Sequence, residues 1–460
     1  MTGRHALLTT VAAFSLLLGG VVAGQNPPAA PQGAPPAGTF QFRDGRSEVV
    51  EVPLVAGDGA FEVTWPEISK PDWDTALLGV SVSSDAGAHL PFIGIASGSA
   101  SARQYVRAGD AGLRWVNLSF LRGAVSAGTR VTLRADGEAI VPGPSVLRLF
   151  SSHPDLSKTI LVLAPHPDDA EIAAFGVYAH RQATVVTVTS GNAGVATYDS
   201  VFSDLPQHYA FKGHIRVIDS ITVPWQGGIP PARTFNMGYF DARLPDMYAK
   251  PDQVIPEMYS TNTDIGVYLK DNIGSLLPKR PRASTWNNLV DDMETLLKKV
   301  KPAVILAPQP QLDLHRDHDF VTVALAAALA RWKKPVTLLL YTNHADANRY
   351  PYGPAGTVVS LPPPVARDVL LDRVYSHPVS PELQRLKLFA LESQHDLRYT
   401  PTRQYQLAAN DERAAAPEKP GPAPDISYFR RGPRANELFF VYDQDSVKPM
   451  VERFLADRPR

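Results

Sequence analysis

The sequence predicts two domains. A smaller all-β, sandwich-like domain precedes an α/β domain that has a Rossmann-like, mostly parallel sheet with helices on both faces. Residues 39–145 hold short runs of alternating polar and apolar side chains separated by Asp-Gly turns, a pattern typical of antiparallel strands. From residue 151 onward, continuous apolar runs alternate with helical segments, which indicates a parallel sheet. The length of 460 residues also exceeds that of one ordinary domain.

Residues 1–24 have the composition of a secretory signal peptide. A short basic start precedes a small and apolar run over residues 6–23, and Val21-Val22-Ala23 offers a cleavage site of small residues. An uncleaved anchor is the alternative, but the run is near the lower length limit for a membrane span, and polar residues dilute it. We therefore expect a cleaved signal, no stable membrane insertion, and a periplasmic or secreted protein. Residues 25–38 follow as an extended Pro/Ala linker.

The β domain carries strand patterns at residues 48–52, 61–65, 78–82, 114–120 and 130–134. Three of its aromatic residues, Trp65, Trp73 and Trp115, fit either a surface that stacks on sugars or the domain core. Core aromatics are the commoner case, so we favour the core.

The α/β domain spans residues 151–455. Its apolar runs predict strands at 160–164, 183–189, 221–225, 303–307, 336–341 and 437–442. Helices are expected at 170–180, 214–220, 287–299 (opened by Ser284 or Thr285) and 321–332. The long connections 196–212 and 246–284 indicate functional loops or disorder, and 402–434 a surface excursion. No Gly-x-Gly-x-x-Gly follows the first strand, so nothing indicates a dinucleotide.

Two His/Asp motifs follow two of the predicted strands. His166-Pro167-Asp168-Asp169 comes directly after strand 160–164, and His315-Arg316-Asp317-His318 comes shortly after strand 303–307. The first motif alone is most often a plain turn, since Pro and Asp favour turns. However, the carboxyl ends of parallel strands share one edge of the sheet, where ligands bind. Together the two motifs supply the nitrogen and oxygen ligands that suit zinc.

These motifs resemble those of the PIG-L (LmbE-like) zinc-dependent N-deacetylases. The family carries a Pro-His-Pro-Asp-Asp stretch, here residues 165–169, and a His-x-Asp-His stretch, here residues 315–318. Glu171, the strand and glycine loop at 186–194, and the helix ending in Ser393-Gln394 also resemble the family, so the resemblance covers roughly residues 155–400. Asp313 departs from it, because some relatives carry a catalytic Tyr there, which leaves the leaving-group acid open.

Amide hydrolysis suggests a role for each motif residue. A catalytic zinc takes three protein ligands and one water, and His166, Asp169 and His318 are the natural set. Asp168 lies next to a ligand but points differently along the chain, so we expect it to be the general base.

His315 and Asp317 are expected to assist. His315 lies about one helical turn from His318 if a helix begins at Asp317 or His318, and it is placed to stabilise the oxyanion and pass a proton to the amine. Asp317 either fixes the tautomer of an imidazole or caps the helix, and both roles are compatible.

The resemblance implies two substrate-binding residues. Arg216 resembles the family arginine that holds polar groups of the substrate, and Asp241 the acidic residue that binds a sugar hydroxyl. An ordinary ion pair is the alternative for both. The remaining histidines lack such a context and are expected to be solvated or in the core: His180, His208, His214, His344, His377 and His395.

Composition excludes several classes. The net charge of −1 gives no electrostatic case for binding nucleic acid or an anionic membrane. The absence of Cys excludes a thiolate metal site, a Cys nucleophile and any disulfide.

We therefore expect an exported Zn²⁺ hydrolase that removes an N-acetyl group from an amino sugar of the N-acetylglucosamine type, in a glycan or glycoconjugate. An amidase acting on a non-glycan small molecule is one alternative, and a catalytically inactive glycan-binding protein is another. We also expect the chain from residue 151 onward to fold and bind zinc alone, because both motifs lie within it.

Overall fold

The computed structural model describes residues 39–84, 90–198, 201–277, 282–332, 334–363, 368–395 and 428–457. The predicted signal peptide and linker, and most of the predicted excursion at 402–434, lie outside these ranges. Within them, none of the helices has the length and hydropathy needed to cross a membrane.

The predicted all-β domain is confirmed. It is one eight-stranded antiparallel sheet in the order β6-β5-β8-β3-β2-β9-β4-β7. The strands are β2 (Glu48–Ala56), β3 (Phe61–Thr64), β4 (Thr75–Ser84), β5 (Phe92–Ser97), β6 (Ala100–Tyr105), β7 (Ala111–Asn117), β8 (Arg130–Asp136) and β9 (Glu138–Phe150), with a 3-10 turn η1 (Ser119–Leu121) after β7. The Gln104 side chain links the two outer strands, because it donates to the Trp115 carbonyl oxygen (2.9 Å) and accepts from the Asn117 N–H (2.8 Å). The sheet is therefore nearly a barrel.

The tryptophans of this domain belong to its core. Trp65 and Trp73 are 1% and 4% exposed and lie 5.5 Å apart between ring centroids. Trp115 packs edge-on against Phe42, with 5.1 Å between the ring centroids. They therefore form no sugar-stacking surface.

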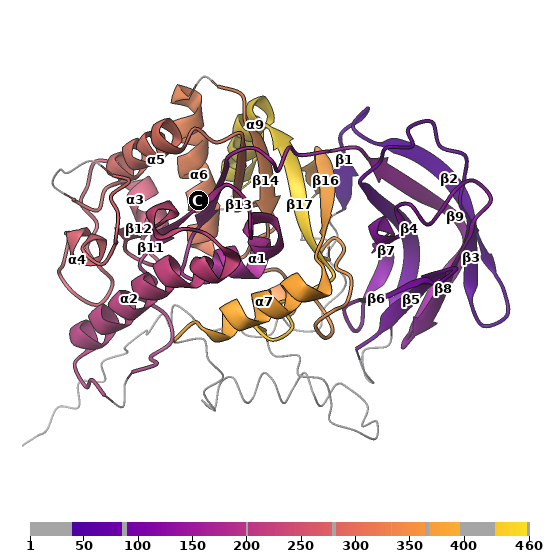
Figure 1. Ribbon diagram of the computed structural model, residues 1–460, viewed down its shortest axis with the longest axis horizontal. Helices are drawn as coiled ribbons and strands as arrows, with labels where there is room; N and C mark the ends of the chain where they lie inside the picture. Colours follow the sequence, from indigo (N-terminus) through magenta and orange to yellow (C-terminus); the bar gives the residue numbers. More distant parts are fainter. Residues whose placement is uncertain are drawn as a thin grey trace, which may run out of the picture.

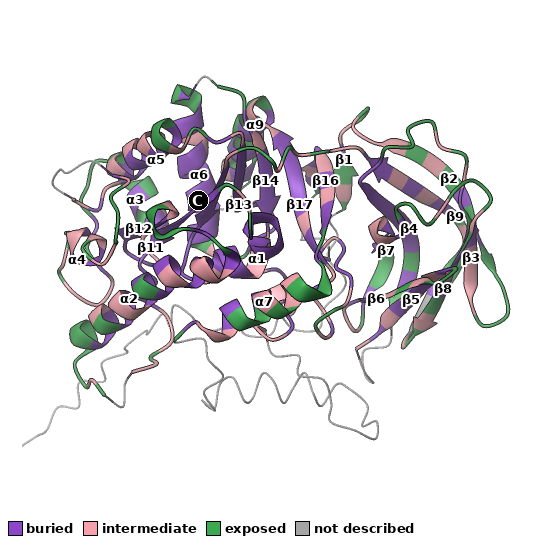
Figure 2. Ribbon diagram, in the orientation of Figure 1, coloured by how far each residue is buried: buried purple, intermediate pink, exposed green. Residues whose placement is uncertain are grey.

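The predicted mostly parallel sheet with helices on both faces is also confirmed (Figure 1). Its strand order is β12-β11-β10-β13-β14-β17-β16. The first five strands pair in parallel. Strand β17 pairs antiparallel with both of its neighbours, β14 and β16. The strands are β10 (Ile160–Ala164), β11 (Ala183–Thr189), β12 (Thr234–Tyr239), β13 (Val304–Pro308), β14 (Thr337–Tyr341), β16 (Arg373–Pro378) and β17 (Asn436–Asp443). The central strands are buried along their whole length (Figure 2), because helices cover both faces.

One apolar core under the sheet includes residues of α1 (Asp169–Tyr178) and α7 (Pro381–Glu392). The core on the opposite face includes residues of α3 (Leu244–Ala249), α5 (Trp286–Val300), α6 (Arg316–Arg331) and α9 (Gln444–Ala456), together with α2 (Leu205–Thr222) beside β12. Thr285 caps α5 by accepting from the Asn288 N–H, as one of the two predicted caps. The shorter elements are α4 (Gly266–Leu269), η2 (Val223–Gly227), η3 (Pro231–Arg233) and η4 (Asp346–Asn348).

The predicted strand at 221–225 is wrong. These residues end α2 and begin η2. Asp204 accepts from the Gln207 N–H and opens α2, and Val217 and Ile221 lie one helical turn apart on its buried side. Pro224 has no N–H for a sheet ladder. The third parallel strand is instead β12, and α2 also occupies the second half of the predicted connection 196–212.

The two domains share buried contacts. β1 (Phe40–Phe42) pairs in parallel with β15 (Val369–Leu371) of the α/β domain. Asn117 donates to the Val359 carbonyl oxygen (2.8 Å) and to Ser376 Oγ (3.0 Å), and the Ser376 N–H donates to Thr75 Oγ1 (2.8 Å). Apolar side chains of the β domain, including Phe150, join the core of the α/β domain.

Candidate metal centre

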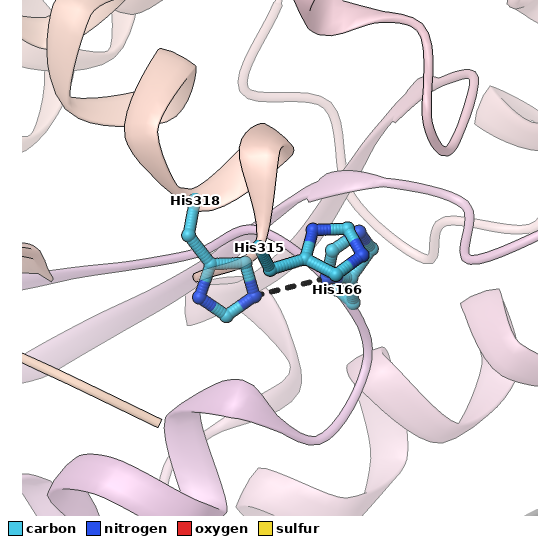
Figure 3. Close-up of side chains that lie close together, drawn as sticks. All are labelled: His166, His315 and His318. Atoms are coloured by element: carbon cyan, nitrogen blue, oxygen red, sulfur yellow. Dashed lines mark hydrogen bonds between the residues drawn. The ribbon is translucent and has the colours of Figure 1, made fainter. Parts of the chain in front are cut away.

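The two predicted motifs meet at the carboxyl edge of the sheet. β10 and β13 are hydrogen-bonded neighbours with Ile160 opposite Val304, so the loops that follow them leave the sheet side by side. His166 comes from the loop after β10, and His315 and His318 come from the start of α6 (Figure 3). Helix α6 begins at Arg316, earlier than predicted, and thus includes most of the second motif.

Three side-chain atoms form a small triangle. His166 Nδ1 lies 3.2 Å from His318 Nε2 (dashed line in Figure 3) and 3.3 Å from Asp169 Oδ2, and His318 Nε2 lies 3.1 Å from Asp169 Oδ2. A tetrahedral Zn²⁺ with bonds of about 2.0–2.1 Å would hold its ligand atoms roughly 3.3–3.4 Å apart. The triangle therefore fits three corners of such a site, with two nitrogens and one oxygen as the donor set.

The opposite nitrogen of each imidazole faces a carboxylate. His318 Nδ1 lies 3.1 Å from Asp313 Oδ2. His166 Nε2 lies 3.0 Å from Asp241 Oδ1 and 3.4 Å from Asp317 Oδ2. Each outer nitrogen is thus placed to donate its hydrogen to a carboxylate, which leaves the lone pair of the inner nitrogen directed into the triangle.

Asp169 is held from both sides. Its Oδ2 accepts from the His166 N–H (2.8 Å), and its Oδ1 accepts from the Asn343 amide (2.8 Å). It lies in the first turn of α1 and is fully buried. A fixed carboxylate needs little reorganisation to bind a cation.

Buried negative charge gives the centre a strong preference for cations. Burial alone would lower the pKa of His318, but the charges of Asp169 and Asp313 outweigh it and raise the pKa to about 10. For His166, burial alone would likewise lower the pKa. The charge of Asp241 outweighs burial and raises the pKa well above its ordinary value. A metal ion would replace these protons and balance the same negative charge, since ligands bind metals in their deprotonated form.

Asp168, the predicted base, precedes α1 with a φ of 117°. This left-handed conformation is uncommon for a non-glycine residue and is often found at functional sites. Its Oδ2 lies 3.2 Å from Nη2 of Arg216, which also donates to the Pro167 carbonyl oxygen (2.5 Å). The structure thus places Arg216 against the proposed base, and its predicted contact with substrate stays a prediction.

His315 lies over the metal ligands. Its ring centroid is 4.5 Å from that of His166 and 5.1 Å from that of His318. Its Nδ1 is buried and has no hydrogen-bond partner among the residues that the structure describes. Burial, and then the charge of His166, lower its pKa well below the ordinary value. A neutral imidazole with an unsatisfied nitrogen is suited to a contact with substrate.

Asp317 and Asp241 are engaged within the protein. Asp317 accepts from the backbone N–H groups of Ala242 (2.6 Å) and Leu244 (3.2 Å). It does not cap α6, since the N-cap residue is His315, so its predicted contact with an imidazole, His166, is the relevant one. Asp241 accepts from the Ala193 N–H (3.2 Å) besides facing His166. Its predicted contact with a sugar hydroxyl stays a prediction.

Asn343 and His344 were not anticipated at the centre from the sequence, and Asp313 was noted there only as a departure from the family pattern. Asp313 orients His318, and Asn343 orients Asp169. His344 lies with its ring centroid 4.7 Å from that of His318 and its Nε2 3.9 Å from Asp169 Oδ1. Asn343 and His344 follow β14, the parallel neighbour of β13. The rule that brought the two motifs together therefore also applies to these residues.

Two further residues of the resemblance, Glu171 and Gln394, contact each other. Glu171 is a buried residue of α1, and it accepts from the Tyr178 hydroxyl (2.7 Å) and from the Gln394 amide (3.3 Å). Burial raises the pKa of Glu171 to about 7. Of the remaining histidines, His395 pairs with Asp219 and His214 with Asp271, outside the triangle.

Comparisons with curated proteins and with solved structures give at most distant likenesses. No curated protein matches the chain. Among solved structures, GalB, the 4-carboxy-2-hydroxymuconate hydratase of Pseudomonas putida KT2440, is 13% identical over 62% of this chain and 95% of its own, with a TM-score of 0.29. The acetyl xylan esterase Est2A of the rumen bacterium Butyrivibrio proteoclasticus is 10% identical over 63% and 86%, with a TM-score of 0.17. At these scores neither likeness carries a conclusion.

The family comparison is specific. The family model described as PIG-L, GlcNAc-PI de-N-acetylase, matches residues 161–329, which include both metal motifs and all three triangle residues. The chain therefore carries a PIG-L family domain.

Proposed function

We propose that this protein is a zinc-dependent N-deacetylase that removes the acetyl group from an amino sugar of the N-acetylglucosamine type in a glycan or glycoconjugate. The observation that carries the proposal is the triangle of His166, Asp169 and His318, with Asp168 next to it, inside a domain whose family is named for a GlcNAc de-N-acetylase. Zinc is proposed from the donor set of two imidazoles and one carboxylate.

His166, Asp169 and His318 would hold the metal, which when bound polarises the acyl carbonyl and makes water a better nucleophile. Asp168 takes a proton from the attacking water as its oxygen bonds to the carbonyl carbon. The carbon–nitrogen bond then breaks, and the nitrogen leaves as an amine with that proton. The remaining proton of the water leaves as acetic acid ionises and is taken up by the amine, so the products are acetate and the ammonium form of the free amino sugar, and atoms and charge balance.

His315 assists these steps in the proposal. One N–H of its neutral ring donates to the oxygen that gains negative charge, and the ring relays the proton to the departing nitrogen. Its position against His166 and His318, with Nδ1 buried, supports this role, because a hydrogen bond is stronger where water is excluded. Arg216 holds the Asp168 carboxylate in place at 3.2 Å.

Export is part of the proposal. It rests on the signal-peptide pattern of residues 1–24, and the mature chain would begin close to Gly24 or Gln25. The intact mass of material recovered outside the cytoplasm tests this. A mass that still includes residues 6–23 would indicate a membrane anchor instead.

Acetate release from a substrate panel tests the function. The panel holds chitooligosaccharides, peptidoglycan fragments, glycans with internal N-acetylglucosamine, and simple N-acetylated amines. Release only from the sugars supports the proposal, and release only from the simple amines supports the small-molecule amidase. Glycan binding without acetate release, by protein shown to contain its metal, would establish the inactive binding protein. Metal-loaded Asp168→Asn serves as the control for contaminating activity.

A further inference from the structure

His344 lies next to the metal centre and is partly exposed. It follows β14 at the edge where both motifs lie, with its ring centroid 5.5 Å from that of His315 and 4.7 Å from that of His318. The His344 side chain is 23% exposed, whereas the His318 side chain is completely buried. His344 is therefore closer to the surface of the described chain than His318 is.

The orientation of this ring is fixed. Nδ1 lies 2.7 Å from Oδ1 of Asn348, an amide oxygen that can only accept, so Nδ1 carries the hydrogen and Nε2 the lone pair. The ring of Tyr428 lies nearly parallel to that of His344, at 6.1 Å and 14°, and its hydroxyl donates to the Asn343 carbonyl oxygen (2.6 Å).

The turn that brings the Asn348 side chain against His344 has a strained backbone. Asp346, Ala347 and Asn348 have φ values of 48°, 53° and 65°, a run of left-handed conformations without glycine. Each such residue costs free energy, and strain of this kind persists where the surrounding structure enforces it. Here it delivers the amide oxygen that sets the tautomer of His344.

His344 forms, with Asp169 and His318, a second group whose ligand atoms lie within 4.8 Å of one another, but it is less closely placed than His166. It approaches Asp169 only to 3.9 Å, at Oδ1, whereas Oδ2 is the oxygen that faces His166 Nδ1 and His318 Nε2. A catalytic metal site keeps a position open for water and substrate. The lone pair of His344 is thus available to the substrate.

We propose that His344 is a further catalytic residue, whose Nε2 accepts a hydrogen bond from the N–H of the amide being hydrolysed. This deepens the proposed N-deacetylase function and rests on it. An acylated amine has one donor next to the reacting carbon, its N–H. His344 provides an oriented acceptor for that donor, and Asn348 is a positioning residue that acts through it. An O-acetyl ester lacks this hydrogen, so the contact favours amides over esters.

The test compares di-N-acetylchitobiose with its counterpart in which a 2-O-acetyl ester replaces one N-acetyl group. The ratio of kcat/KM for amide to that for ester is measured for the native protein and for His344→Ala. The ratio should fall on the order of 10-fold, the scale of one hydrogen bond between neutral groups. His344→Gln retains an acceptor oxygen and should recover part of the ratio, and metal content per chain should stay unchanged in both variants.

Two further variants complete the test. Asn348→Gly suits the positive φ and removes the acceptor for Nδ1, so it should lower the ratio less than His344→Ala does. His180→Asn, at an exposed histidine also with positive φ, should leave the ratio unchanged.

The outcomes separate the two proposals. Loss of metal in His344→Ala would make His344 a ligand and overturn the inference. An unchanged amide-to-ester ratio of kcat/KM, including one in which both values fall equally, would also overturn it. A native protein that is metal-loaded yet releases no acetate from any amide would overturn the proposed function, and the inference with it.

Discussion

Asp313 Oδ2 lies 3.1 Å from Nδ1 of His318, and the same oxygen accepts from the backbone N–H groups of Asn343 (2.9 Å) and His344 (3.3 Å). One carboxylate thus orients a ligand ring and holds the loop after β14 against the metal centre. It lies at the position where the family resemblance leads one to expect a tyrosine.

This contact predicts an effect on metal affinity. Replacing Asp313 by Ala removes the acceptor for His318 Nδ1, so the ring is free to turn and to change tautomer. We expect metal affinity to fall about 10- to 100-fold, the usual scale for losing such a partner. Competition with a chromophoric chelator measures it. Asp155→Ala, which removes an exposed carboxylate bonded only locally to Ser157, is the control. Equal affinity of Asp313→Ala and the native protein would contradict the assignment.

Replacing each of the two neighbouring aspartates of the first motif should have a different effect on metal binding and turnover. Asp169→Asn removes the anionic oxygen from the triangle, so we expect weaker metal binding and, with it, lower activity. Asp168→Asn should retain nearly full metal content but lower turnover on the order of 10²-fold or more, because a general base is lost.

Metal content and turnover are measured on both variants, and excess zinc is added to each. Added zinc should rescue part of the Asp169 variant and none of the Asp168 variant. A metal-free Asp168→Asn would exchange the two roles, and near-normal turnover in it would abolish the base.

The parts of the fold that depend on strong local patterns were predictable. The buried runs at 160–164 and 183–189 coincide with β10 and β11, since Ile, Val and Leu, joined in the second run by β-branched Thr, suit a strand covered on both faces. β12 was missed because Asn236 and Gly238 interrupt its apolar run. Asn236 is tolerated there because its amide donates to the Thr189 carbonyl oxygen and to Ser220 Oγ, contacts that only the tertiary structure supplies.

The centre shows the same limit. His166, Asp169 and His318 lie in two spaced motifs, so the sequence indicated the set that meets in space. His344 stands alone in the sequence and lies near them only because β14 is the neighbour of β13. Strand order is set by packing between distant segments, so a histidine without a motif gives no local signal.

The shared contacts between the domains revise the expectation that the α/β domain stands alone. A chain beginning at residue 151 would lose the Asn117 and Thr75 contacts with Ser376 and Val359, and β15 would lose its partner β1. It would also expose apolar surface that Phe150 and its neighbours cover. We expect this truncated protein to be insoluble or aggregated when expressed, and size-exclusion chromatography beside the full chain checks it. A monomeric, metal-binding product would restore the original expectation.

The buried pair of Lys387 and Glu437 should stabilise the helix that carries Asp169. The two side chains are 2% and 3% exposed, with 2.7 Å between Lys387 Nζ and Glu437 Oε1. Glu437 also accepts from the N–H groups of Gly176 (2.8 Å) and Val177 (3.1 Å) in α1, and Lys387 donates to the Ile172 carbonyl oxygen (2.8 Å). The pair therefore joins α1, α7 and β17.

Removing only the Lys387 cation should lower the free energy of unfolding more than neutralising both partners does. Lys387→Met leaves a buried carboxylate without a counter-charge, and we expect the free energy of unfolding to fall by about 3–5 kcal/mol. The double variant Lys387→Met with Glu437→Gln removes that charge, and the single Gln oxygen still accepts from one of the two α1 N–H groups. It should therefore be more stable than the single Lys387→Met variant, although it carries one more substitution. Urea denaturation of the three proteins in the same metal-loaded state measures this order. A double variant less stable than Lys387→Met would mean that Glu437 acts through its hydrogen bonds to α1 rather than through its charge.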